Sequence, residues 1–181
     1  MRSSPLFIGI GLISIGLICM TAIAANAPEP AAPNLHQLMK DVVAVKTQVV
    51  WDIGNQAQDD KGNPDASKLK AGDWTRVIQA STQVKQAAQS LATAKHVKAA
   101  APGEKLQSEG EPGAFGAKEV QAVIDAKPEV FRAFASALAA SMDPVLAAAQ
   151  TKDAAKLFKA SEPIDQICED CHVQFWYPNQ K

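Results

Sequence analysis

Apolar side chains recur every three or four residues along four stretches of the chain, a spacing that predicts amphipathic helices. The first stretch begins at Asn34, a favourable N-cap residue, and ends between residues 54 and 60, before a Gly62-Asn63-Pro64 turn. The inner faces of the four stretches are predicted to hold Leu35, Met39, Val42, Val45, Val49 and Ile53; Trp74, Val77, Ile78, Ser81, Val84, Ala88 and Leu91; Phe131, Phe134, Leu138, Met142, Val145 and Ala149; and Leu157, Phe158, Ile164, Ile167 and Phe175.

The second helix is predicted to begin with Asp73 as its N-cap and to last to about Val97. Residues 100–116 hold four glycines and two prolines with few large apolar side chains, which predicts a long loop. A short helical piece is expected at about residues 118–126.

Proline marks the third and fourth helices. Pro128 lies in the first turn of the third, where a missing N–H does no harm, and Pro144 is expected to kink that helix. The fourth is expected to begin around Thr151 or Lys152 and to run into the C-terminus, with a kink or restart at Pro163, near Ser161.

The composition supports an all-α fold. The sequence holds 33 alanines and 10 glycines, and alanine is the best helix former and a poor strand former. Because no stretch can bury its apolar stripe alone, and the connections favour antiparallel neighbours, we expect an antiparallel four-helix bundle. The 18 Lys and Arg against 19 Asp and Glu give a net charge of −1, so the chain lacks the excess positive charge that is typical of proteins that bind nucleic acid.

The N-terminus carries the pattern of an export signal. Arg2 is followed by an apolar run at residues 6–20 and by Ala22-Ile23-Ala24, which fits signal-peptidase cleavage after Ala24. We therefore predict a signal peptide and the start of a linker at 1–27, a proline-rich linker at 28–33, one domain at 34–181, and a periplasmic protein. An uncleaved membrane anchor is the alternative, since residues 6–25 are just long enough to span a bilayer. Lipidation at Cys19 is disfavoured by the preceding Ile18.

The chemistry is concentrated at Cys168-Glu169-Asp170-Cys171-His172, the C-x-x-C-H attachment motif of c-type haem. Two thiols at i and i+3 lie on one helix face, where both can add to the haem vinyl groups. The histidine that follows gives a nitrogen to the iron. Covalent haem attachment in bacteria occurs outside the cytoplasm, so the export signal and the motif agree independently.

Three other interpretations of the cysteine pair are weaker. A thioredoxin-like redox pair belongs in a βαβ unit, and no strands are predicted here. A disulfide across i and i+3 of a helix would be strained and would close almost no loop. A zinc site needs about two further Cys or His ligands, and none lies at residues 99–167.

A haem motif near the C-terminus of a four-helix bundle resembles the class II c-type cytochromes, the family of cytochrome c′ and cytochrome c-556. Residues 131–140, 147–158 and 168–175 are similar to the last two helices of that family. The resemblance covers most of the mature chain, strongly over the last 50 residues. The chain departs from the family in its long 100–116 loop and in Leu35, where many members carry an arginine that contacts a haem propionate; His36 or Lys40 could substitute.

The resemblance implies one haem c per chain, with Met39 on the first helix as the sixth iron ligand. The expected function is then single-electron transfer to redox partner proteins, with no enzyme activity, and a homodimer through the first two helices is possible. His36 is the other candidate ligand. The alternative is an open sixth site that binds nitric oxide or carbon monoxide, as in cytochrome c′. A peroxidase-like enzyme lacks a visible distal acid/base pair.

The aromatic residues are placed as a buried cofactor would require. Phe175, Trp176 and Tyr177 lie within six residues of His172, where they either contact the haem or pin the helix end to the bundle. Trp51 is expected to line the same pocket, because it faces much the same side as Met39. Trp74 is expected in the core, and His96 in solvent.

Overall fold

The computed structural model describes residues 31–178, and this range is mostly helical. The helical elements are α1 (Leu35–Leu38), the π-helical turn η1 (Met39–Val43), α2 (Ala44–Gln56), the 3₁₀ turn η2 (Ala66–Lys68), α3 (Ala71–Thr93), α4 (Ala117–Ala126), α5 (Pro128–Thr151) and α6 (Ala154–Phe175). No strand occurs in these residues, which form only two isolated bridges, Asn34 with Lys98 and Gln58 with Pro64. The predicted all-α class is confirmed for the described residues.

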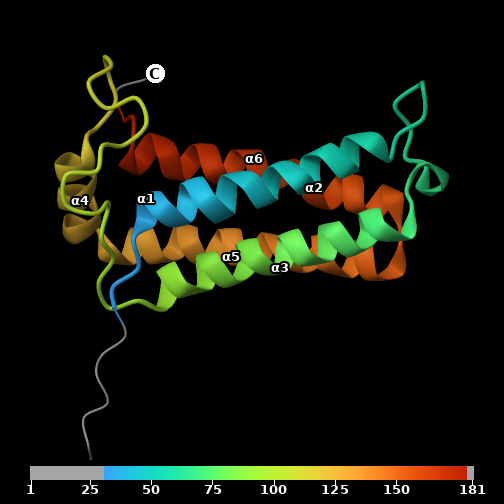
Figure 1. Cartoon of the computed structure of the whole chain (residues 1–181), viewed down its shortest axis with the longest axis horizontal. Helices are drawn as coiled ribbons and strands as arrows, with labels where there is room; N and C mark the ends of the chain where they lie inside the picture. Colours follow the sequence, from blue (N-terminus) through green and yellow to red (C-terminus); the bar gives the residue numbers. More distant parts are fainter. Residues whose placement is uncertain (1–30, 179–181) are drawn as a thin grey trace, which may run out of the picture. The chain divides into compact units, whose positions relative to one another are not determined.

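Long helical segments pack side by side around a shared core (Figure 1). The elements α1, η1 and α2 follow one another without a break and pack against α3 and α6, while α5 packs against both α3 and α6. The colour gradient in Figure 1 shows each long segment running opposite to the one before it. The short α4 contacts α5 and α6 at the end where α1 begins.

The core has two clusters of buried apolar side chains. The larger follows the long helices and includes Val50, Val84, Met142 and Ile164, each with no exposed surface. The second lies near α4 and consists of Leu91, Val97, Ala99, Val120, Ile124, Phe131, Ala135 and Phe175. Leu38 and Met39 pack against both clusters. The first helix, which is the continuous run of α1, η1 and α2, therefore joins the two clusters.

The first helix departs from the predicted apolar stripe. Val45, expected on the inner face, is 50% exposed, whereas Val43, Thr47 and Val50 are buried. The cause is η1, in which the Ala44 amide donates to the Met39 carbonyl, five residues back. Such a turn holds more residues than an α-helical turn, so every later side chain is rotated about the axis relative to an uninterrupted 3.6-residue period.

Two helix starts differ from the prediction. Asp73 is not the N-cap of α3: it lies inside the first turn, where its carboxylate accepts the Lys70 amide at 2.9 Å. An acidic side chain supports a helix start from this position as well as from the cap, which is why the sequence misplaced the boundary. The last helix begins at Ala154 rather than at Thr151 or Lys152, because Lys152 is left-handed (φ 53°) and Asp153 caps the Lys156 amide at 3.0 Å.

Two helix starts agree with the sequence, and one helix end does not. The Asn34 side chain caps the first helix by accepting the Gln37 amide at 3.1 Å, and Pro128 occupies the first turn of α5. α3 ends at Thr93 rather than near Val97, because the next residue, Ala94, is extended (φ −65°, ψ 135°). Val97 is buried outside the helix, and its carbonyl accepts from the side chain of Gln121. The predicted long loop lies between α3 and α4.

The prolines do not end the helices that contain them. α5 continues through Pro144, and α6 continues through Pro163. The helix does not restart near Ser161, and the kinks at the two prolines stay predictions. Pro163 lies beside Ile164 and Ser161, both buried, and the Ser161 hydroxyl donates to the Phe158 carbonyl at 2.8 Å. Burial on both sides of the proline offsets the one backbone hydrogen bond that it removes.

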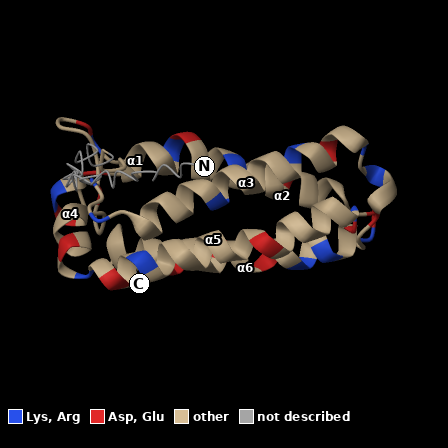
Figure 2. Ribbon diagram, turned by 90° about the horizontal axis from the view of Figure 1, so that it is seen from below, with Lys and Arg blue, Asp and Glu red and all other residues tan. Residues whose placement is uncertain are grey.

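α5 is long and apolar enough, by length and composition, to cross a membrane. It also packs against α3 and α6 and buries Phe131, Leu138 and Met142, as a core helix does. Figure 2 shows basic and acidic residues interspersed along the described helices. The predicted signal peptide and most of the linker, residues 1–30, lie outside the described residues, so export and the alternative of a retained anchor stay predictions.

Candidate functional site

A cavity of about 400 Å³ lies between the first helix, the start of α5 and the end of α6. Its walls are mainly apolar. The large apolar residues on them are Leu35, Met39, Val43, Trp51, Leu91, Leu106, Val120, Phe131, Phe134, Leu138, Ile167, Phe175 and Trp176. A largely apolar cavity of this size with a few polar groups is typical of a small-molecule or cofactor site.

All three motif residues of α6 line this cavity. Cys168, Cys171 and His172 are spaced i, i+3 and i+4, which places them on one helix face. Both thiols are free and half-buried. Burial raises the pKa of both thiols, that of Cys171 to about 12, so both are neutral at physiological pH.

This environment disfavours the other interpretations of the cysteine pair. Reactive redox cysteines are activated by a lowered pKa, whereas burial here raises it. The two cysteines do not form a disulfide. Within residues 31–178, no group of three or more His, Cys, Asp and Glu side chains is arranged to hold a metal ion. A zinc site therefore lacks ligands in the described part of the chain.

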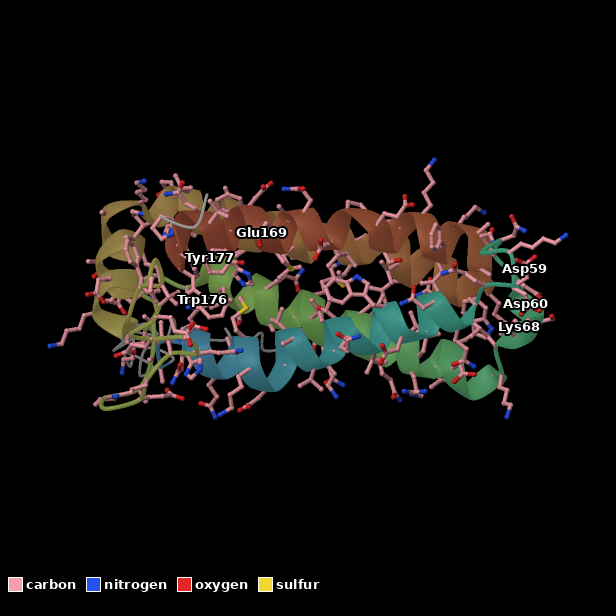
Figure 3. All side chains as sticks on the ribbon, turned by 90° about the horizontal axis from the view of Figure 1, so that it is seen from above. Asp59, Asp60, Lys68, Glu169, Trp176 and Tyr177 are labelled. Atoms are coloured by element: carbon pink, nitrogen blue, oxygen red, sulfur yellow. The ribbon has the colours of Figure 1, made fainter. Side chains whose placement is uncertain are left out.

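The His172 ring packs against two aromatic residues that follow α6. Its centroid is 5.0 Å from that of Trp176, edge to face, and 5.7 Å from that of Tyr177. Tyr177 Oη is 3.3 Å from His172 Nδ1 and donates to Glu169 Oε2 at 2.7 Å. Burial lowers the pKa of His172, which favours the neutral imidazole that binds metals. Figure 3 shows Glu169, Trp176 and Tyr177 together near the end of α6.

The first helix lines the cavity through His36, Met39, Lys40, Thr47 and Trp51. Met39 is half-buried at the start of η1. Thr47 is 2% exposed, and its hydroxyl has no hydrogen-bond partner among the described residues. Lys40 is the one lysine or arginine among the lining residues of the described chain, and Asp165 and Glu169 are the carboxylates.

The long loop closes one end of the cavity, with Leu106 and Gln107 on its wall. Its Glu104 carboxylate lies 2.9 Å from His36 Nδ1 and accepts from the Asn34 side chain at 3.3 Å. At the other side, the Gln107 carbonyl accepts Trp176 Nε1 at 3.2 Å, and the Phe115 amide donates to the Trp176 carbonyl at 2.7 Å. The loop thus ties the first helix to the end of α6.

The structure brings Cys168, Cys171, His172, Met39 and His36 to one cavity, and their roles as ligands stay predictions. Trp51 lines the cavity, whereas Trp74 is buried in the larger core cluster and His96 is exposed, as expected.

Sequence reasoning missed Glu104, Thr47 and the hydrogen bonds of Tyr177. Glu104 lies in a loop without periodicity, so nothing in the sequence pairs it with His36. Thr47 lies on the cavity wall because of the rotation at η1, and the apolar pattern does not reveal that rotation.

Comparison of the chain with models of protein families, with curated proteins and with solved structures finds no match.

Proposed function

We propose that this chain is an exported class II c-type cytochrome, a four-helix bundle that holds one haem c and carries single electrons in the periplasm. One observation carries the proposal: the complete C-x-x-C-H set of α6 and Met39 of the first helix line a single apolar cavity. Redox partner proteins and a possible homodimer belong to the same proposal.

The residues of the cavity fit a covalently attached haem. Each cysteine thiol would add across one vinyl double bond, with the sulfur bonding to one carbon and the proton passing to the other. This addition consumes neither an oxidant nor a reductant, and both thiols are free and protonated. The neutral His172 imidazole would bind the iron, and the apolar walls would cover the porphyrin faces.

The bound haem would supply a one-electron couple at its iron. Met39, from the first helix, is the proposed sixth ligand, and a thioether there favours the ferrous state relative to a second histidine. If His172 and Met39 both held the iron, the residues around it would need little rearrangement when it changed oxidation state. The mainly apolar walls would reduce the access of water to a bound haem, which would also limit that rearrangement.

Lys40 is the proposed partner of a haem propionate. It lies on the cavity wall one residue after Met39. Among the described residues that line the cavity it is the one lysine or arginine, and a positive side chain is needed to pair with the negative propionates. His36, the other residue considered for this role, has Glu104 at its Nδ1. A histidine already facing a carboxylate is a poorer partner for a second one.

Attachment is tested by haem staining after denaturing electrophoresis of protein expressed with active haem-attachment machinery. The wild type should stain at the mass of the protein, and the Cys168→Ala/Cys171→Ala double variant should not. An unstained wild-type band would refute the proposed cofactor.

Met39 ligation is tested by the ferric charge-transfer band that marks sulfur–iron coordination, near the red end of the spectrum. The band should be present in the wild type and in Met142→Leu, which changes the core methionine that does not line the cavity, and absent in Met39→Ala. A wild-type protein that is high-spin and binds carbon monoxide readily when reduced would refute the electron-transfer function and favour gas binding.

A further inference from the structure

The two residues that follow α6 contact the proposed iron ligand. α6 ends at Phe175, and the amides of Trp176 and Tyr177 both donate to the His172 carbonyl, at 2.7 and 3.0 Å. The Trp176 bond continues the i to i−4 pattern of the helix and the Tyr177 amide shares the same carbonyl, so the chain stays close to the end of α6 and the Tyr177 hydroxyl lies near the His172 ring. The loop hydrogen bonds to Trp176 hold this segment in place.

The Tyr177 hydroxyl bridges two side chains of α6. Its Oη lies 2.7 Å from Glu169 Oε2 and 3.3 Å from His172 Nδ1. A phenol has one proton, and an ionised carboxylate is an acceptor only, so that proton is donated to Glu169. Toward His172, the same oxygen can then act only as an acceptor, and Nδ1 must carry the ring proton.

The other neighbour of the ring does not compete for Nδ1. Trp176 packs edge to face on His172, but its indole N–H donates to the Gln107 carbonyl at 3.2 Å. In the described part of the chain, the polar side-chain atom recorded within hydrogen-bond distance of Nδ1 is therefore Tyr177 Oη.

From this proton arrangement we infer that Glu169 and Tyr177 are positioning residues that hold His172 with Nδ1 protonated and Nε2 facing the haem iron, and that they lower the reduction potential. The inference rests on the proposed function. A histidine ligand whose second nitrogen donates to an oxygen acceptor is oriented and becomes more basic. Greater electron donation by the ring stabilises ferric over ferrous iron, and the negative carboxylate strengthens the effect by polarising the phenol.

The holoprotein tests the inference by redox titration of the wild type, Tyr177→Phe, Glu169→Gln and the double variant. Tyr177→Phe keeps the ring and the net charge and should shift the equilibrium toward ferrous iron by roughly threefold to tenfold, the upper figure being about 59 mV for one electron. Glu169→Gln should shift it in the same direction.

The double variant separates a hydrogen-bonded relay from simple charge. If Glu169 acts through Tyr177, Glu169→Gln should have a smaller effect in the Tyr177→Phe background than in the wild type. Asp170→Asn is the matched control, because it removes the same charge from the neighbouring exposed position, where Gln166 rather than Tyr177 is the partner. Asp170→Asn should shift the potential equally in both backgrounds.

The iron–histidine stretching frequency gives a second measurement, taken on ferrous protein in a Met39→Ala background, where the ligand opposite His172 is absent. It should fall in Tyr177→Phe, because the ring then donates less to the iron. An unchanged potential and stretching frequency in haem-loaded Tyr177→Phe, or equal Glu169→Gln shifts in both backgrounds, would overturn the inference while leaving the cytochrome proposal intact. A wild type that attaches no haem would overturn both.

Discussion

His36 Nδ1 on the first helix lies 2.9 Å from the carboxylate of Glu104, a residue of the long loop. The same carboxylate accepts the Ala101 amide at 3.0 Å and the Asn34 side chain at 3.3 Å. One side chain therefore fastens the loop to the start of the first helix, beside the cavity. Since Leu106 and Gln107 line the cavity two and three residues further on, the contact affects how well that end is closed.

Replacing Glu104 with Gln should loosen the loop. We expect faster hydrogen exchange across residues 101–109 in Glu104→Gln, and no change in Glu111→Gln, whose exposed side chain lies in the same loop. Unchanged exchange in Glu104→Gln would show that the Trp176 contacts alone hold the loop.

The Glu104 contacts should also make the loop sensitive to acid. Hydrogen bonds from Ala101 and Asn34, and then the charge of His36, lower the pKa of Glu104 below its ordinary value of 4.5. Because the folded pKa is lowered, its stabilisation is present at neutral pH and is lost as the pH falls below 4.5 through the folded value. Wild-type exchange rates, corrected for intrinsic pH dependence, should approach those of Glu104→Gln in that window, whereas the variant should show little change.

The proposed propionate contact predicts that Lys40→Gln lowers the reduction potential. Removing a positive charge beside the haem favours the ferric state, which carries one positive charge more. Lys46→Gln, which removes the same charge from a position of the first helix outside the cavity wall, should have a smaller effect. The two potentials should be measured at low ionic strength, and equal shifts would argue against a propionate contact by Lys40.

Thr47→Val should stabilise the holoprotein by about 1 kcal/mol, because it replaces a buried hydroxyl that has no partner with a methyl group of similar shape. Thr82→Val provides the matched comparison, since the Thr82 hydroxyl donates to the Ile78 carbonyl at 2.7 Å. That variant should be destabilised by about 1 kcal/mol. Both free energies of unfolding should be measured by denaturant titration. A destabilised Thr47→Val variant would mean that the wild-type Thr47 hydroxyl bonds to the bound cofactor.

The sequence predicted the helices well because each carries a long apolar stripe and clear punctuation at its ends. Asn34 and Pro128 mark helix starts through local chemistry alone, and the structure confirms both. Asp73 was misplaced because an acidic residue can support a helix start from the cap or from inside the first turn. Local patterns thus located the helices but not every boundary.

The candidate site was only partly predictable, for a different reason. Cys168, Cys171 and His172 are adjacent in sequence, so their spacing places them on one helix face without any knowledge of the fold. The contacts of Glu104 with His36 and of Gln107 with Trp176 join residues about 70 positions apart, and no local pattern encodes them.

The π turn itself can be tested by removing one residue. η1 has one residue more per hydrogen-bonded turn than an α-helix, so deleting the exposed Asp41 should restore an ordinary α-helix from Leu35 to Gln56. Relative to α2, the side chains before the deletion would then rotate by about 100°, which carries Met39 away from its present position on the cavity wall. The sulfur–iron band should disappear, while haem staining persists because Cys168 and Cys171 lie on α6. Asp41→Asn keeps the residue count and should retain the band; a band that survives the deletion would show that η1 does not position Met39.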